Sequence, residues 1–557
     1  MKSRRILTSL FVLALLAPAI GAMAHEHHGA EGGNADAAIE KFGTVHMPIS
    51  CTAAVQAPFE RGVALLHSFW YEEAEKQFKA IAETDPQCAM AQWGLAMTEW
   101  RPFWDGMPDE RRKAGTAEID QAEALHAKTD REQRYIAALA DYMHGSAAQK
   151  EQALHAYNDA MAALTKAYPD DIEAQAFYGL GLAAAVGTVD PVGDARKALA
   201  VLEPGFQAHP DHPGFAHYII HTCDSPQLAR EALPAAERYA SIAPSSAHAL
   251  HMPAHIFARL GMWKEDIASN KASVKASEYA ETHHLGGIGH QMHADEFLLY
   301  AYLQQGDDAE AKRIHTLIEP LVAHLQTVPG IADDDMAGFA SYFQVELPDI
   351  YGLELSDWKS VLAVPEPPKP LVSARYYRVW GQAIAAGHLR DADAADAAAA
   401  SAKSLYDATA AEGSPISLEI QAAQGTIDAW QSFAHHQDEK ALEQIGQAAD
   451  IQDRVGQAEV DIPAREMYGD MLLIDGRPAE ALEQYRTALQ LSPNRFNGLY
   501  HAGRAAEGAG KPAEALVFYK QLLKVTNGGA HSQRQEVAYA REFVQNGAKP
   551  RKSASLP

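Results

Sequence analysis

The chain has 557 residues, enough for several folding units or for one long repeat array. Acidic residues outnumber basic residues by 73 to 47, so the formal net charge is −26 at pH 7. A chain this acidic repels phosphate backbones, and we therefore expect no nucleic-acid partner. No stretch after the N-terminal segment reaches the roughly 18 apolar residues that a membrane span needs.

Residues 1–24 have the pattern of a secretory signal peptide. Basic residues at Lys2, Arg4 and Arg5 precede an apolar run, and small residues lead to an expected cleavage after Ala24. We therefore expect an exported protein that resides in the periplasm, with secretion as the alternative.

Residues 25–50 form a His-rich N-terminal segment that we expect to be flexible. Cleavage would expose His25-Glu26-His27-His28, whose free amine and third-position histidine can bind copper or nickel in a square-planar site. The alternative, which we favour, is a tail that no partner uses.

Three cysteines bear on the redox state of the protein: Cys51, Cys88 and Cys223. In an oxidising compartment Cys51 and Cys88 could pair near the start of the fold. Cys223 would then be left over, and a buried, unreactive thiol is the interpretation that we favour.

Small and large apolar residues recur at helical spacing, in pairs of helices joined by turns. Near the C-terminus four residues return after 34 positions: Gly469, Pro478, Ala481 and Tyr485 recur as Gly503, Pro512, Ala515 and Tyr519. Near the N-terminus the related set is Gly62, Ala74, Phe78 and Pro86. This pattern resembles the tetratricopeptide (TPR) repeat, in which small residues let helices approach and a large residue fills the gap.

The chain shows no alternating strand pattern, so we predict an all-α fold, a TPR-like solenoid of helical hairpins. The resemblance implies a right-handed superhelix. A proline-rich linker at 364–370 is predicted to separate an N-terminal array (51–363) from a C-terminal array (371–545). Residues 546–557 are expected to form a flexible tail.

Nine of the 26 histidines lie between His217 and His293. Pro244 and Gly261 set a repeat grid with starts at 213 and 247, and Gly306 restarts the grid at 292. In the TPR family, positions 2, 5, 9 and 12 of the first helix face a concave groove. Six histidines fall at positions 2, 5 or 9 of their repeats: His217, His221, His248, His251, His255 and His293.

Three consecutive first helices should therefore present imidazoles to one groove. Helices pack roughly 8–10 Å apart, and imidazoles on neighbouring helices can share an ion at about 2.0–2.1 Å. We predict a transition-metal site on these histidines, with zinc or copper as the candidates. The rival is a polar patch that binds an anionic or peptide ligand. If the site is catalytic, Glu296 at position 5 of the third repeat is the candidate base.

An apolar stripe occupies the same positions of the repeat that starts at 89. Its members are Met90, Trp93, Met97 and Trp100. A stripe of this kind is most often core, and an N-terminal cap could bury it. If it is open, it forms a binding surface beside the histidines.

Residues 59–100, 213–304 and 468–519 resemble a group of exported bacterial TPR proteins, through motifs that include HYIIH and HxxHMPxHIF. The resemblance implies an architecture and no particular reaction. Our first hypothesis is a binding or adaptor scaffold that holds a protein, a peptide or a small ligand in its groove. The alternative is a metal-dependent enzyme, hydrolytic or redox, that uses the histidine cluster.

Overall fold

The computed structural model describes residues 41–547, except 104–106, 147–148, 188, 284, 329–332, 368–370 and 412–415. The expected signal peptide and the His25-Glu26-His27-His28 segment lie outside the described residues. Across the described ranges the secondary structure is helical, with no strand. None of the helices described is long and apolar enough to cross a membrane.

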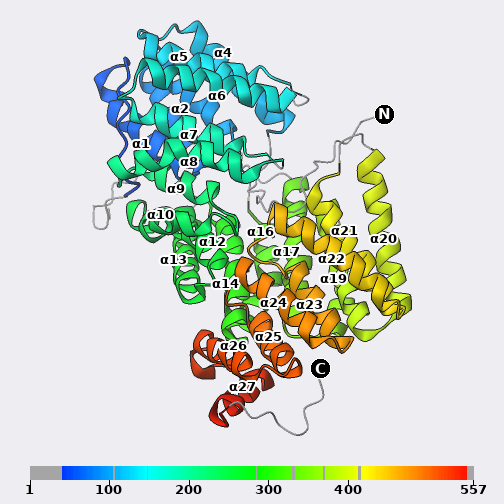
Figure 1. The fold of residues 1–557 in the computed structure, drawn as a ribbon. Coiled ribbons are helices and arrows are strands. Elements are labelled where there is room, and N and C mark those ends of the chain that lie inside the picture. Colours follow the sequence, from blue (N-terminus) through cyan, green and yellow to red (C-terminus); the bar gives the residue numbers. More distant parts are fainter. Residues whose placement is uncertain are drawn as a thin grey trace.

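The N-terminal block is built from helices that pack in sequence as antiparallel hairpins (Figure 1). A short 3-10 helix, η1 (Ala53–Val55), precedes them. They are α1 (Gln56–His67), α2 (Tyr71–Thr84), α3 (Ala89–Glu99), α4 (Asp109–Ala124), α5 (Asp130–Met143), α6 (Lys150–Ala167), α7 (Ile172–Ala184) and α8 (Pro191–Ala208).

The middle of the chain joins this block to the C-terminal helices (Figure 1). Its helices are α9 (Pro213–Thr222), α10 (Ala229–Ile242), α11 (Ala247–His251), α12 (Pro253–Arg259), α13 (Trp263–Thr282), α14 (Ile288–Gln305), α15 (Asp308–His315), α16 (Ile318–Leu325), α17 (Asp333–Glu354) and α18 (Trp358–Leu362).

The C-terminal part again consists of consecutive helical hairpins. The helices are α19 (Val372–Leu389), α20 (Ala392–Ala411), α21 (Leu418–Ala434), α22 (Asp438–Val455), α23 (Ala464–Ile474), α24 (Pro478–Leu491), α25 (Phe496–Gly508), α26 (Pro512–Val525) and α27 (Gln535–Gln545), with a 3-10 turn η3 (Asn527–Gly529) before the last.

The repeat glycines let each second helix lie close to the first. A Cβ atom added at Gly503 would lie 2.4 Å from the ring of Tyr519, and one at Gly469 would lie 2.8 Å from the ring of Tyr485. Gly62 meets the Phe78 ring in the same way, at 2.8 Å. A side chain at these positions would push the two helices apart. The contacts agree with the 34-residue pattern, and the predicted all-α, TPR-like hairpin array is confirmed.

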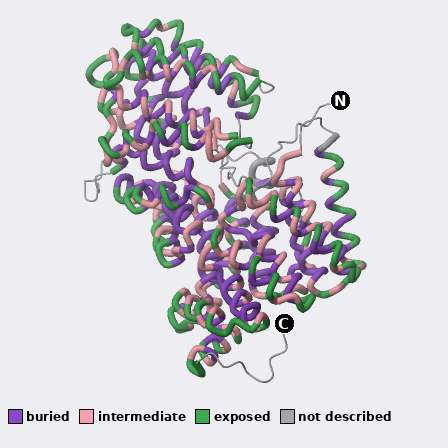
Figure 2. Tube along the Cα trace, viewed as in Figure 1, coloured by how far each residue is buried: buried purple, intermediate pink, exposed green. Residues whose placement is uncertain are grey.

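Buried residues run through the helices (Figure 2), and most of the buried apolar side chains among the described residues belong to two large cores. One extends from Phe42 to Phe257 and the other from Ala254 to Phe543, so they meet at α12. Val361 and Tyr376, on either side of residues 364–370, belong to the same core. The histidine-bearing helices α9, α11, α12 and α14 therefore lie where the two cores join.

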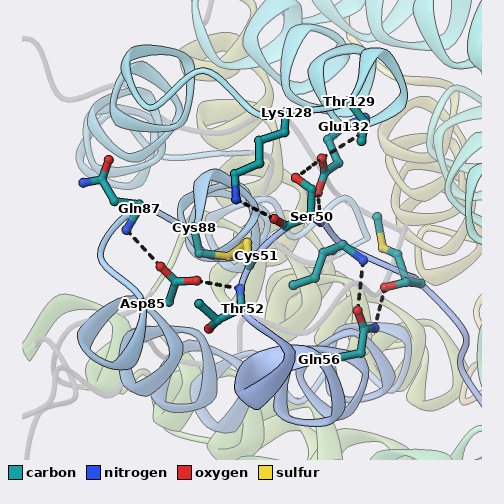
Figure 3. The surroundings of a disulfide bond; sticks show 12 residues. Ser50, Cys51, Thr52, Gln56, Asp85, Gln87, Cys88, Lys128, Thr129 and Glu132 are labelled. Carbon is teal, nitrogen blue, oxygen red and sulfur yellow. Dashed lines mark hydrogen bonds between the residues drawn. A yellow bond between two sulfur atoms is a disulfide. The ribbon is translucent and has the colours of Figure 1, made fainter.

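Cys51 and Cys88 form a disulfide that fastens the segment before α1 to the start of α3 (Figure 3). Hydrogen bonds on either side reinforce it: the Thr52 N–H donates to Asp85 at 2.8 Å, and the Ser50 N–H donates to Glu132 at 2.6 Å. Cys223 is a buried free thiol.

Candidate metal centre

The first group of histidines comes from α9 and α11. His217 and His221 lie one turn apart on α9, and His248 lies on α11. The Nε2 atom of His217 is 3.1 Å from the Nε2 atoms of both His221 and His248. We call these three residues the first triad.

The hydrogen bonding of His217 fixes which ring nitrogen carries its proton. Its Nδ1 atom lies 2.6 Å from the backbone carbonyl oxygen of His67. A carbonyl can only accept, so Nδ1 is the donor and the lone pair of Nε2 points toward His221 and His248. The lone pair of a neutral imidazole is the group that binds a metal ion.

The second group follows the same plan one repeat later. His251 ends α11, His255 lies in the first turn of α12, and His293 lies on α14. Pro253 begins α12, yet the Nε2 atoms of His251 and His255 still meet at 2.9 Å. The rings of His251 and His293 lie with their centroids 4.2 Å apart. We call His251, His255 and His293 the second triad.

The Asn270 side-chain amide accepts a hydrogen bond from the His251 ring nitrogen that faces away from the triad centre. Nδ1 of His251 donates to Oδ1 of Asn270 at 2.6 Å. The amide nitrogen of Asn270 donates to the backbone oxygen of Asp266 at 3.2 Å, which leaves Oδ1 as the group that faces the ring.

Side-chain carboxyl groups contact the other two rings of the second triad. Nδ1 of His255 donates to Asp224 at 2.8 Å and to Glu459 at 3.1 Å. Nδ1 of His293 lies 3.0 Å from Oε2 of Glu296. The oxygen acceptors on Nδ1 of His255 direct its Nε2 toward the triad centre, as they do for metal-binding histidines.

The geometry of both triads suits metal coordination. Within each triad, one nitrogen from every ring lies within 4.8 Å of the corresponding nitrogens of the other two. Metal–nitrogen bonds of about 2.0–2.1 Å place three ligands of one ion within that spread. The repeat grid thus identified six histidines that the structure brings together, and the structure divides them into two sets of three.

Burial keeps most of these rings neutral. It lowers the pKa of His217 to about 3, and it lowers the pKa values of His221, His248, His251 and His293 well below the usual value. Burial acts the same way on His255, but Asp224 and Glu459 outweigh it and raise the pKa of that ring to about 10. Five of the six rings therefore present neutral nitrogen ligands at pH 7.

The TPR resemblance implied that the histidines line an open groove. In the structure they are mostly buried instead. His217, His248, His251, His255 and His293 are all buried, and only His221 is partly exposed. Phe103 stacks on the His221 ring with centroids 4.3 Å apart, and Phe69 lies 4.2 Å from the His217 ring. Phe69 and Phe103 of the N-terminal block thus pack against the first triad. Glu459 from the C-terminal part contacts His255 of the second triad.

The apolar stripe expected beside the histidines is part of the N-terminal core. Its residues are Met90, Trp93, Met97 and Trp100, each no more than 3% exposed. Trp93 packs edge-on against Tyr135 and Phe177, and Trp100 packs against Tyr157. The structure therefore places the stripe in the core, the first of the two alternatives, and these side chains offer no exposed surface.

Glu296, the candidate base, is fully buried behind His293. Burial and the nearby Glu459 carboxylate raise its pKa to about 8. Its hydrogen bond to Nδ1 makes it a positioning group for the ring, and the ring itself lies between Glu296 and the triad centre.

The sequence reasoning did not anticipate Asp224, Asn270 and Glu459. Asp224 lies three residues after the HYIIH motif, so an acid just beyond the end of that helix could have indicated this contact. Arg259 donates to Asp224 at 2.9 Å and lies 3.3 Å from Glu459, which places both carboxylates against His255. Glu459 is 204 residues from His255 in sequence, and no local pattern points to it.

Another buried histidine network lies beside the first triad. Glu173 faces Nε2 of His67 at 2.7 Å and Nε2 of His212 at 3.2 Å, and the His46 N–H donates to it at 3.2 Å. Nδ1 of His67 pairs with the Tyr218 hydroxyl at 2.8 Å. These contacts use both carboxylate oxygens, so we interpret this network as a hydrogen-bonded structural core.

The remaining histidines of the segment lie outside the two triads. His283 is exposed and stacks on Tyr279, and the ring of His290 is 5.6 Å from that of His248. His284 lies outside the described residues.

Comparison with known proteins gives no family. No family model matches the chain, and no curated protein matches it. Solved structures with some likeness include human IFIT1 with m7Gppp-AAAA, at 13% identity over 78% of this chain and 90% of that one, with a TM-score of 0.35. The P58(IPK) TPR domain has 13% identity over 89% of this chain and 98% of that one, with a TM-score of 0.21. Likeness this weak carries no argument, and the TPR-like description rests on the helix packing given above.

Proposed function

We propose that this chain is a TPR-like binding scaffold that holds late first-row transition-metal ions, zinc or copper, on its two histidine triads. The observation that carries the proposal is the convergence of Nε2 atoms at 2.9–3.1 Å, while Nδ1 of His217, His251 and His255 faces an oxygen atom. One cation can bind the lone pairs of three neutral imidazole nitrogens at once.

A proton is the competing occupant in the second triad. With its raised pKa, His255 can carry a proton on Nε2 and donate it to His251 across 2.9 Å. One proton satisfies only that pair of nitrogens, whereas one metal ion satisfies all three rings. Metal binding should therefore release a proton from this triad.

The donor set favours particular metals. Imidazole nitrogen suits zinc and copper, whereas magnesium, calcium and manganese prefer oxygen ligands. The convergent atoms of both triads are all nitrogen, and the carboxylates face the back of the rings.

A metal-dependent enzyme is the second candidate. Catalytic zinc sites commonly have three protein ligands and one open position, which is the number that each triad supplies. A metal with an open position can polarise a carbonyl or activate water. This candidate differs from the scaffold by one property, because it requires a small molecule to reach the ion.

The test is the metal content of the exported protein, purified without an affinity tag. His25, His27 and His28 are replaced by alanine so that the N-terminal segment cannot contribute. We expect bound zinc or copper that is lost in a His217→Ala/His255→Ala variant and kept in His283→Ala, which alters an exposed histidine of the same segment. Protein that binds neither metal, and whose melting temperature neither metal changes, would rule out the proposal.

A further inference from the structure

We infer that the two triads form one two-ion centre, in which each triad binds one ion and the two ions interact. This inference rests on the proposed metal-binding function. Two ions held as neighbours can share a ligand, which two separate sites cannot do.

The two triads are built alike. Each uses two histidines one turn apart, at positions 5 and 9 of a repeat, and a third at position 2 of the next repeat. The first triad takes His217 and His221 with His248, and the second takes His251 and His255 with His293. Because successive first helices pack side by side, one repeat step shifts the whole ligand set to the adjacent position.

The two sets are close enough for their ions to interact. His221 and His255, from different triads, have ring centroids 6.4 Å apart, and His248 and His251 are also 6.4 Å apart. A bound metal lies roughly 3.2 Å from the centroid of its ligand ring, so the two ions would be at most about 13 Å apart. The two triads are therefore adjacent at two ring pairs, His221 with His255 and His248 with His251.

The surroundings make the two positions unequal. Asp224 and Glu459 accept a hydrogen bond from His255 in the second triad, while a neutral peptide carbonyl accepts one from His217 in the first. Carboxylates behind the rings increase ligand basicity and offset the charge of a divalent ion. The second triad should therefore fill first.

Aromatic rings restrict what else can reach the ions. Phe103 and Phe69 lie against the first triad, and the Phe297 ring lies with its centroid 4.9 Å from those of His251 and His255. The shared ligand should therefore be small, of the size of hydroxide or azide.

The experiment uses the full exported chain in which the three N-terminal histidines are replaced. Cu(II) is the only metal added. Bound copper is counted by equilibrium dialysis, and the electron paramagnetic resonance signal is measured per bound copper. His221→Ala/His248→Ala removes the first triad, and His255→Ala/His293→Ala removes the second. His283→Ala is the matched control.

We expect two coppers in the parent and in the control, and one in each triad variant. The signal per copper in the parent should be at least twofold weaker or visibly broadened compared with either variant, because neighbouring spins interact. The first equivalent of copper should give the spectrum of the variant that retains the second triad.

Two results would overturn the two-ion inference, and a third would overturn the predicted filling order. A parent spectrum equal to the sum of the two variant spectra would mean independent sites. One copper per chain, lost from either variant, would mean a single shared ion. Two coppers that fill in the opposite order would contradict the role given to the carboxylates. No copper or zinc at all would instead refute the proposed function. If a double variant fails to fold by circular dichroism, His221→Gln and His293→Gln replace it.

Discussion

Arg495 is the side chain whose loss should damage the fold most directly. It precedes α25 and is 1% exposed, and it donates to Glu354 at 2.7 Å and to Glu466 at 2.9 Å. It also donates to the backbone oxygen of Asp461 at 2.8 Å and contacts the Tyr300 hydroxyl. One guanidinium therefore joins helices from the middle and the C-terminal parts of the chain.

Replacing Arg495 by methionine keeps much of the volume and removes the charge. Glu354 and Glu466 would remain as carboxylates that are 0% and 2% exposed. Removing one partner of a buried ion pair costs about 3–5 kcal/mol. For a folding unit of about 150–250 residues this corresponds to a fall in melting temperature on the order of 10 °C.

The destabilisation should depend on pH. Burial already raises the pKa of Glu466, and Arg495 opposes that shift. Without the arginine, the folded-state pKa of this carboxyl rises further above its unfolded value. The variant should therefore be least impaired at low pH, where the carboxyl is protonated in both states, and should lose stability as the pH rises.

The assay is thermal unfolding by circular dichroism at pH 5 and pH 8, with Arg486→Met as the control. Arg486 pairs with Glu514 on the surface, where the two side chains are 32% and 28% exposed, and its loss should cost about 0–1 kcal/mol. Equal melting temperatures for the two variants at pH 8 would show that the Arg495 network is not desolvated, and would refute the reasoning.

Four further outcomes are expected. Asp224→Asn keeps the shape but removes the carboxylate behind His255, and should weaken zinc binding by about 10–100-fold in a chelator competition; unchanged affinity would contradict that role. Glu173→Gln should cost about 1–3 kcal/mol at pH 7. Burial alone would raise the Glu173 pKa, but His212 and His67 hold it well below its usual value, so on acidification below about pH 4.3 the parent should lose more stability than the variant. Gly503→Ala should destabilise by about 1–3 kcal/mol through contact with a tyrosine ring. Gly289→Ala, whose Cβ meets no described atom within 4 Å, should stabilise by about 0.4–1 kcal/mol, and reversed signs in thermal melts would refute the packing argument.

The sequence predicted the helical array because its periodicity is local. A 34-residue repeat predicts which positions of neighbouring helices pack together. Gly503 packs against the Tyr519 ring, as the repeat predicts. The same grid selected His217 and His255 as residues on one side of adjacent helices. Their use as metal ligands stays a prediction.

What the sequence could not predict depends on contacts between distant segments. The division into two triads follows from distances across α9, α11, α12 and α14, which a repeat grid does not contain. The burial of Trp93 depends on Tyr135 and Phe177 of later helices. The orientation of Glu296 behind His293 follows from side-chain direction on α14, which position numbers alone do not give.

The contact between His255 and Glu459 has a consequence for biosynthesis. The two residues are 204 positions apart, and His293, the last triad ligand, also precedes Glu459. A growing chain therefore possesses all six imidazoles well before it possesses this carboxylate, and contacts so distant in sequence form slowly. Ions present early would meet rings that Glu459 does not yet orient, whereas ions supplied after release would meet the finished site. If the triads bind metal as proposed, the timing of metal supply relative to chain completion should determine how uniformly the protein is loaded.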